Sequence, residues 1–284
     1  MSRPRAGYIG FTRVPAASAA NSAAGGVWTL REAESFLRDA TWPNSPPGGV
    51  GTNLRLWLNV ANTRSLFNAT TGGSNPSNAG SVKRWEDLSG NGLHFTNDTS
   101  PPTLATNSVN GLPVVVFSSA SNQYLRCTTL AVTGSANRTV FVAGRATGTT
   151  SSSFYFALSD NLTDAGGAWG IANDLSLRHT GGRFSVFGSG QSDVFNIVSA
   201  MQNGTTSSDT SMWRNGVSLT ASSRANVGAI NTTGTAMTLA SADGPTGINL
   251  TSCSIGEVIV YASALTSSER AAVESYLINK WGIT

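Results

Sequence analysis

Ser254-Ile-Gly-Glu-Val-Ile-Val-Tyr261 and Thr266-Ser-Ser-Glu269, near the C-terminal end of the chain, decide the fold. The first stretch is apolar and β-branched apart from Glu257, which is typical of a buried strand at the centre of a sheet. The second is a capping box, in which the threonine hydroxyl and the glutamate carboxylate each satisfy a free backbone N–H at a helix start. We therefore expect a central strand followed at once by a helix.

The expected helix carries one apolar face. Val273, Tyr276, Leu277 and Trp281 recur at helical spacing after the capping box. Gly282 follows and should end the helix, because glycine adopts the left-handed conformation of a C-cap without strain. Such a face must lie against a preformed sheet, so the preceding chain has to supply one.

The composition favours strands and turns over surface helices. Charged residues make up 12% of the 284 residues, and the formal net charge is only +3. The 18 basic residues are scattered rather than arranged in a stripe that follows a phosphate backbone, so nucleic acid is not an expected partner. No apolar run approaches the ~20 residues of a membrane-spanning helix, so we expect no membrane insertion. A large all-β domain with an extension fits this length.

Two features concern the compartment. No apolar segment of a secretory signal follows Met1, so we expect assembly in a cytoplasm. Cys127 and Cys253 are the only cysteines, and both fall in strand-like segments far apart in sequence. A disulfide is conceivable if their strands are neighbours, but a chain without an export signal is expected to keep two buried thiols.

Residues 1–50 are expected to anchor the chain in an assembly. The first part, to about residue 26, has too few large apolar side chains to offset its ordering entropy, so a neighbouring subunit should hold it. Thr29 to Glu32 repeats the capping-box pattern and opens a short helix, which packs on its own domain or docks on another protein. The Pro-Pro-Gly-Gly sequence at 46–49 then marks a boundary. The proposed anchoring residues are Tyr8, Phe11, Trp28, Leu30, Phe36, Leu37 and Trp42.

From Leu54 onward the chain consists of predicted short strands separated by turns, so residues 51–284 form the second domain. Leu54 to Asn59 alternates with a period of two. Asp87 and Ser89 can bond nearby backbone N–H groups beside Gly-Asn-Gly, which predicts a tight turn locked by side chains. Asn110-Gly111 predicts a hairpin. Short predicted strands separated by turns continue at regular intervals through the middle of the chain, and this pattern predicts a two-sheet sandwich.

These motifs together resemble the laminin-G-like, concanavalin A-like jelly roll over residues 54–284. The resemblance implies an all-β fold of two antiparallel sheets packed face to face, with the first and last strands in one sheet and the C-terminal helix at its margin. We expect the strand from Ser254 to Tyr261 to close the sandwich near the strand that carries Cys127. In chain order, the resemblance rests on Leu54-x-Leu-Trp-Leu, Trp85-x-Asp-x-Ser-Gly-Asn-Gly, Pro102-Thr-Leu, Asn110-Gly-Leu-Pro-Val-Val-x-Phe117, Tyr124-Leu, Trp213-Arg-Asn-Gly-Val217 and Gly256-Glu-Val-Ile-Val-Tyr261.

The N-terminal stretch Gly26-Val-Trp-Thr-Leu-Arg-Glu, with Trp42-Pro43, is similar to a segment of tailed-bacteriophage virion proteins, where it precedes receptor-binding or structural modules. It implies a non-enzymatic virion structural protein of the capsid, neck, tail or fibre, assembled in the host cytoplasm. The arm would contact other virion proteins, and a homo-oligomer such as a trimer is expected. The alternative is a carbohydrate-binding adhesin that recognises host-surface glycan.

No catalytic constellation is recognised. Retaining glycosidases need two carboxylates about 5–5.5 Å apart. The Glu-x-Asp-x-(x)-Glu string of the β-glucanases of this fold is not found, and Glu257 stands alone on its strand. His94 and His179 have no Gly-x-Ser-x-Gly partner, so no nucleophilic triad is predicted. We therefore expect no enzyme and interpret Glu257 as a structural hydrogen-bonding residue.

Calcium is the one cofactor that the sequence suggests, since laminin-G-like domains often bind it at the rim of the sandwich. Hard oxygen ligands of the kind that calcium prefers are clustered in one part of the sequence. The alternative is that they cap the backbone of their own turns. The candidates are Asp160, Asn161, Asp164 and Asp174.

Carbohydrate binding would use an exposed aromatic platform with amides beside it. Trp169 lies near Asn173, and Trp213 lies near Asn215. The alternative is that both tryptophans pack in the core or on a sheet.

Overall fold

The computed structural model describes residues 46–147, 154–161, 163–188, 193–242 and 250–284. Within them, Pro47–Thr284 belong to one structural unit. The arm, its short helix and the proposed anchoring residues lie outside the described residues, so their roles stay predictions. No helix of the described part is both long and apolar enough to cross a membrane. The proposed anchoring residues, which lie outside the described part, are Tyr8, Phe11, Trp28, Leu30, Phe36, Leu37 and Trp42.

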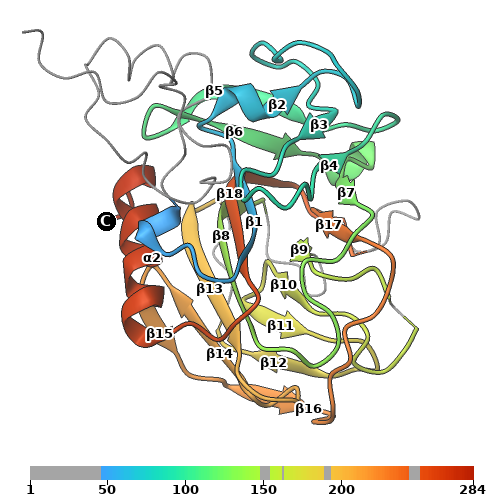
Figure 1. Cartoon of the computed structure of the whole chain (residues 1–284), viewed down its shortest axis with the longest axis vertical. Helices are drawn as coiled ribbons and strands as arrows, with labels where there is room; N and C mark the ends of the chain where they lie inside the picture. Colours follow the sequence, from blue (N-terminus) through green and yellow to red (C-terminus); the bar gives the residue numbers. More distant parts are fainter. Residues whose placement is uncertain (1–45, 148–153, 162, 189–192, 243–249) are drawn as a thin grey trace, which may run out of the picture. The chain divides into compact units, whose positions relative to one another are not determined.

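Two antiparallel sheets make up the fold (Figure 1). Sheet A has eight strands in the described residues, in the order β15 (Val217–Leu219), β14 (Thr210–Arg214), β13 (Asn196–Gln202), β8 (Arg138–Ala146), β18 (Cys253–Tyr261), β6 (Leu112–Phe117) and β5 (Thr103–Val109), with β1 (Leu54–Asn59) also paired to β18. Sheet B has ten, in the order β16 (Ser223–Ala225), β12 (Phe184–Val186), β11 (Ser176–Arg178), β10 (Gly170–Ala172), β9 (Phe154–Ala157), β17 (Met237–Leu239), β7 (Leu125–Cys127), β4 (Phe95–Thr96), β3 (Arg84–Trp85) and β2 (Leu66–Phe67). The predicted all-β jelly-roll sandwich is confirmed.

Strand β18 occupies the centre of sheet A, as its sequence predicts. All nine of its residues are buried. It pairs with β8 along one side, and with β6 and β1 along the other. The first and last strands therefore share a sheet, as the jelly-roll resemblance implies. Strand β7, which carries Cys127, belongs to sheet B, where it pairs with β17 and β4, so it is not a paired neighbour of β18.

The turn at residues 87–91 caps the free edge of β1. Asp87 Oδ1 accepts hydrogen bonds from the backbone N–H groups of Trp57 and Ser89, each at 2.9 Å. Ser89 Oγ donates to the carbonyl of Arg55 at 2.9 Å, and Asn91 Nδ2 donates to that of Leu54 at 3.1 Å. The predicted side-chain-locked turn is confirmed, and its polar groups satisfy a strand edge that would otherwise be open to another chain.

Helix α2 (Ser267–Trp281) packs against β13 and β8 of sheet A. Its capping box forms as predicted, since Thr266 accepts from the Glu269 backbone and Glu269 accepts from the Thr266 backbone. Gly282 ends the helix with a φ of 64°. The short 3-10 helices are η2 (Pro47–Gly49), η3 (Thr63–Ser65) and η4 (Ser119–Ser121).

One main core fills the space between the sheets. Strands of both sheets contribute its large aromatic side chains, among them Phe141 from sheet A and Phe156 from sheet B. Cys127 and Cys253 are both free and buried, which confirms the expected pair of thiols. A continuous core of this kind fixes each sheet so that its outer face can hold side chains in defined positions.

Candidate functional site

Directly opposed residues form a continuous line across all ten strands of sheet B. In an antiparallel sheet such partners point to the same face. Their neighbours in the strands, such as Leu125, Phe156 and Leu177, belong to the main core, so the line faces outward. We call it the cross-strand row. Its members are Phe67, Arg84, Thr96, Arg126, Thr238, Ala157, Gly170, Arg178, Phe184 and Ala225.

Each arginine of the cross-strand row is paired with a carboxylate. Arg84 pairs with Glu86 at 3.1 Å. Arg126 pairs with Asp160 at 2.8 Å, and Arg178 pairs with Asp174 at 2.7 Å. The row is therefore close to neutral, although it is rich in charged groups.

Two aromatic rings carry guanidinium groups at opposite ends of the row. The Arg84 guanidinium lies 3.9 Å from the centre of the Phe67 ring, and that of Arg178 lies 5.4 Å from the Phe184 ring. These stacks hold planar hydrogen-bonding groups in fixed orientations. The Nε groups of Arg126 and Arg178 are buried and have no hydrogen-bond partner in the described part of the chain. The outer face of sheet B thus holds ordered donors and acceptors beside aromatic rings toward its two ends, whereas Thr238 and Ala157 in the middle of the row are buried.

The predicted aromatic platform is not assembled in the structure. Trp169 is fully buried, and its Nε1 donates to Gln202 at 3.4 Å, so it offers no face to a ligand. Trp213 is half-buried on the outer face of sheet A, where the Arg270 guanidinium lies 4.1 Å from its ring centre. The sequence could not show that the two tryptophans lie in different sheets.

The two predicted amides also stay apart. Asn173 is 3% exposed and follows β10 of sheet B. Asn215 follows β14 of sheet A, where its Oδ1 accepts from the backbone of Ile197 at 2.8 Å. The two amides therefore belong to different sheets.

The predicted calcium ligands serve ion pairs and turns. Asp160 lies with Asn161 and Asp164 after β9, whereas Asp174 lies in the turn at the opposite end of β10. Burial raises the pKa of Asp160, but hydrogen bonds from Arg126, Thr235 and Ala236 outweigh it and hold the pKa below its ordinary value. In the described residues, no group of three or more His, Cys, Asp or Glu side chains is arranged to hold a metal.

Asn161 shows the turn chemistry that the sequence left as an alternative. Its Oδ1 accepts from the backbone N–H groups of Thr163 and Asp164, both at 3.0 Å. Its Nδ2 donates to Asp164 at 2.8 Å. Asp174 Oδ1 likewise accepts from the backbone of Ser176 at 3.2 Å. These oxygen atoms already have protein partners.

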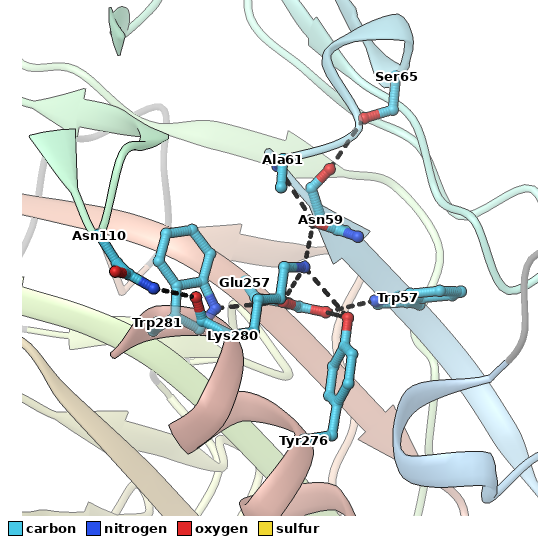
Figure 2. Close-up of polar contacts among 9 residues, drawn as sticks. All are labelled: Trp57, Asn59, Ala61, Ser65, Asn110, Glu257, Tyr276, Lys280 and Trp281. Atoms are coloured by element: carbon cyan, nitrogen blue, oxygen red, sulfur yellow. Dashed lines mark hydrogen bonds and ion pairs between the residues drawn. The ribbon is translucent and has the colours of Figure 1, made fainter. Parts of the chain in front are cut away.

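Glu257 lies in a second polar region, between sheet A and helix α2 (Figure 2). Its Oε1 accepts from Trp57 Nε1 at 2.6 Å and from the Tyr276 hydroxyl at 2.9 Å. Its Oε2 accepts from Lys280 Nζ at 2.7 Å and from Trp281 Nε1 at 3.2 Å. The carboxylate is fully buried. Four donors satisfy it, as a buried charge requires, which supports its structural interpretation.

Asn59 completes this region, which we call the Glu257 cluster: Trp57, Asn59, Glu257, Tyr276, Lys280 and Trp281. Asn59 lies directly opposite Glu257 in the pairing of β1 with β18. Its Oδ1 accepts from Lys280 Nζ at 2.7 Å and from the backbone of Ala61 at 3.1 Å. Burial lowers the pKa of Lys280 below its ordinary value, although the Glu257 carboxylate acts in the opposite direction.

Glu257 was predicted from the sequence as a structural residue, but the roles of Asn59 and Lys280 were not predicted. One signal was present. Asn59 and Glu257 are each a polar residue in a strand that is otherwise mostly apolar, and two such residues can satisfy each other only if their strands pair. The cross-strand row had no such signal, because most strands of sheet B have only two or three residues.

Comparison with known proteins shows a fold but no family. No protein-family model matches the chain, and no curated protein matches its sequence. The structure is similar to the binding domain of Paraclostridial Mosquitocidal Protein 1, with a TM-score of 0.51 and 14% identity over 80% of this chain and 52% of that one. The chain thus spans about half the length of this structure.

Two further similar structures superpose with lower scores. They are domain 4 of AbnA, a GH43 extracellular arabinanase from Geobacillus stearothermophilus, in complex with arabinotriose (TM-score 0.45, 12% identity, 79% of this chain and 98% of that one), and Trypanosoma rangeli sialidase (TM-score 0.44, 14% identity, 80% and 33%). At these identities the similarity describes the fold alone.

Proposed function

We propose that this chain is a non-enzymatic display protein whose sandwich binds neutral carbohydrate on the outer face of sheet B. The cross-strand row is the observation that carries this proposal. Sugar hydroxyls both donate and accept hydrogen bonds, so planar guanidinium and carboxylate groups suit them. Phe67 and Phe184 add apolar surface at the two ends of the row.

The charge balance of the row indicates a neutral ligand. An anionic sugar would be attracted by unpaired arginines, but Arg84, Arg126 and Arg178 each have a carboxylate partner. An anion could bind an arginine only by displacing its carboxylate partner, whereas a neutral sugar leaves all three ion pairs in place. The side chains of Arg126 and Arg178 are 25% and 18% exposed, so a sugar hydroxyl can bind their exposed guanidinium atoms without breaking either ion pair.

The proposal requires no catalysis and no metal. The carboxylates beside the cross-strand row are Glu86, Asp160 and Asp174, and each is held by an arginine on a different strand. Hydrolysis of a glycoside would need two of them to face one bond from opposite sides. Asp160 has no oxygen left without a donor, so we expect binding to persist in a chelator.

A glycan array with the full chain tests this proposal. We expect neutral glycans to bind and the Arg126→Ala/Arg178→Ala variant to lose at least about tenfold in affinity, because each guanidinium contributes about one charged hydrogen bond. Arg214→Ala is the matched control, since Arg214 lies on β14 of sheet A. Equal binding by all three chains would contradict the proposed site, and a chelator-sensitive affinity would contradict the proposed independence from calcium.

We further propose that residues 1–50 anchor this domain to other proteins of a tailed-bacteriophage virion, where the chain forms a homo-oligomer. The similarity of Gly26–Pro43 to virion segments supports this role, and the laminin-G-like motifs suit a displayed module. Deleting residues 1–46 is expected to abolish incorporation into particles, while circular dichroism should show that Pro47–Thr284, which belong to one structural unit, still fold. Normal incorporation of the shortened chain would contradict the anchoring role.

A further inference from the structure

We propose that Lys280 and Asn59 join through an amide bond that the chain forms on itself, with Glu257 as the proton carrier. Lys280 Nζ lies 2.7 Å from Asn59 Oδ1 and 2.7 Å from Glu257 Oε2 (Figure 2). A carbonyl bond is about 1.2 Å long, so Asn59 Cγ lies within about 4 Å of the lysine nitrogen. An amine, a carboxamide and a carboxylate thus meet in one buried place.

The reaction is a transamidation that needs no oxidant, reductant or cofactor. Glu257 takes one proton from the Lys280 ammonium and leaves a neutral amine. The lone pair of Nζ then attacks Asn59 Cγ and forms a C–N bond. The Cγ–Nδ2 bond breaks, and Glu257 returns its proton to the departing nitrogen. A second proton passes to that nitrogen from Nζ, so the products are a secondary amide and one ammonium ion, and Glu257 is again a carboxylate.

The surroundings of the Glu257 cluster favour each step. Burial favours the neutral amine over the ammonium, and it lowers the pKa of Lys280. The backbone N–H of Ala61, 3.1 Å from Asn59 Oδ1, stabilises negative charge that develops on this oxygen during attack. Trp57 and Trp281 hold the carboxylate in place through their indole N–H groups. The fold therefore fixes the reacting groups together, which replaces a collision in solution.

The other lysine of the chain lacks this arrangement. Lys83 and Lys280 are the only lysines. Lys83 pairs with Asp98, whose side chain is 72% exposed, so water competes for both groups. Lys83 is therefore the internal control for the chemistry.

The bond would tie the first strand of the domain to its last helix. Asn59 ends β1 and Lys280 lies in the last turn of α2, 221 residues further along the chain. Strand β18 lies beside both, so the bond would close almost the whole sandwich covalently. A chain closed in this way resists unfolding because its unfolded state has fewer conformations.

The mass of the intact protein tests the proposal. We expect the denatured full-length chain to weigh less than its sequence mass by one ammonia. Trypsin should fail to cut after Lys280, and digestion should release residues 56–64 joined to residues 271–284, because Arg55, Arg64 and Arg270 bound these peptides. The Glu257→Gln, Lys280→Arg and Asn59→Ser variants are expected to keep their full sequence mass.

Two controls keep the test decisive. Lys83→Arg and Glu274→Gln should retain the lower mass, since Glu274 is also buried on α2 but bonds Ser199 and Arg270 instead of the lysine. Cyclisation of an asparagine that precedes glycine, as at Asn110, also releases ammonia, so the joined peptide must be found. A wild-type chain with full sequence mass, or with an ammonia loss that maps to such an asparagine, would overturn the proposal even if every variant failed to fold.

Discussion

The outer faces of the two sheets differ in how deeply their charged side chains are buried. On sheet A, helix α2 seals the surface, and the side chains of Glu257 and Glu274 are 0% and 4% exposed. On sheet B, no helix of the described part covers the face, and the side chains of Asp160 and Asp174 are 13% and 17% exposed beside their arginines. The same residue types are thus almost completely buried on one face and partly exposed on the other.

Because of this difference, we expect the two faces to contribute differently to stability and to ligand binding. A fully buried charge that loses its partner is left without solvent, which costs several kcal/mol. A charge at the surface regains water, so its ion pair contributes about 1 kcal/mol or less. We therefore expect substitutions on sheet A to unfold the protein and substitutions on sheet B to change its ligand affinity.

The largest effect is expected for Glu257→Ala. It leaves a lysine, two indoles and a phenol without their common acceptor, and we expect the free energy of unfolding to fall by about 4 kcal/mol. Asp174→Ala on sheet B should cost less than about 1 kcal/mol. Both substitutions are made in an Asn59→Ser chain, which cannot form the Lys280–Asn59 amide, and urea denaturation measures each.

The proposed difference between the two faces is contradicted if Asp174→Ala lowers the free energy of unfolding as much as Glu257→Ala does. Glu257→Gln serves as the milder control, because it keeps one acceptor oxygen for Trp57 or Lys280 while it removes the charge. We expect its cost to lie between those of the other two variants.

Acid should weaken the part of the molecule next to sheet B. His179 directly follows β11 and is 6% exposed. Burial, with the charges of Arg138 and Arg183, lowers the pKa of His179 to about 4. The unfolded chain, with an ordinary pKa of about 6.5, binds the proton first as the pH falls. Stability is therefore full above pH ~6.5 and decreases toward pH ~4, by roughly 3 kcal/mol in total.

Urea denaturation between pH 7 and pH 4.5 checks this slope, with His179→Gln as the control that binds no proton. The slope of the variant over this range should be flatter than that of the wild type. Hydrogen exchange at pH 4.5 should rise first in β11 and β12 and last in β18. An equal rise in both sheets, or an unchanged slope in the variant, would show that His179 does not control the acid response.

The sequence predicted the elements that local side-chain chemistry determines. The Thr266–Glu269 capping box, the Gly282 end and the Asp87–Ser89 turn all form as expected, because each interaction joins residues near each other in the chain. Strand β18 was placed at the centre of its sheet because its residues are apolar on both faces. Its neighbours were not predictable for the same reason, since a uniformly apolar strand carries no pattern that selects a partner.

The candidate sites depend on pairings that the sequence does not record. Arg126 and Arg178 lie in short strands, where no periodicity can develop, and they share a face only because four other strand pairings connect them. Trp169 looked suitable for an exposed platform because nothing in its neighbours distinguishes a core tryptophan from a surface one. Lys280 meets Asn59 only after β1, β18 and α2 are all in place.

The smallest expected effect on stability is the difference between substitutions of two glycines, one on each outer face. A Cβ at Gly256 would lie 2.4 Å from the Trp281 ring, and a Cβ at Gly170 would lie 2.5 Å from the Phe154 ring. Trp281 belongs to the main core, whereas Phe154 packs only in a small cluster with Ala157 and Ala242.

We expect Gly256→Ala to lower the free energy of unfolding by about 2 kcal/mol and Gly170→Ala by about 1 kcal/mol, because a ring in the main core cannot move without displacing its neighbours. Thermal melts of the two variants measure the difference. Gly256→Ala should also slow formation of the Lys280–Asn59 amide, since Trp281 holds Glu257 through its indole N–H. A larger loss in Gly170→Ala would mean that the outer face of sheet B is packed as tightly as that of sheet A, and its proposed binding face would then have to open before a ligand could enter.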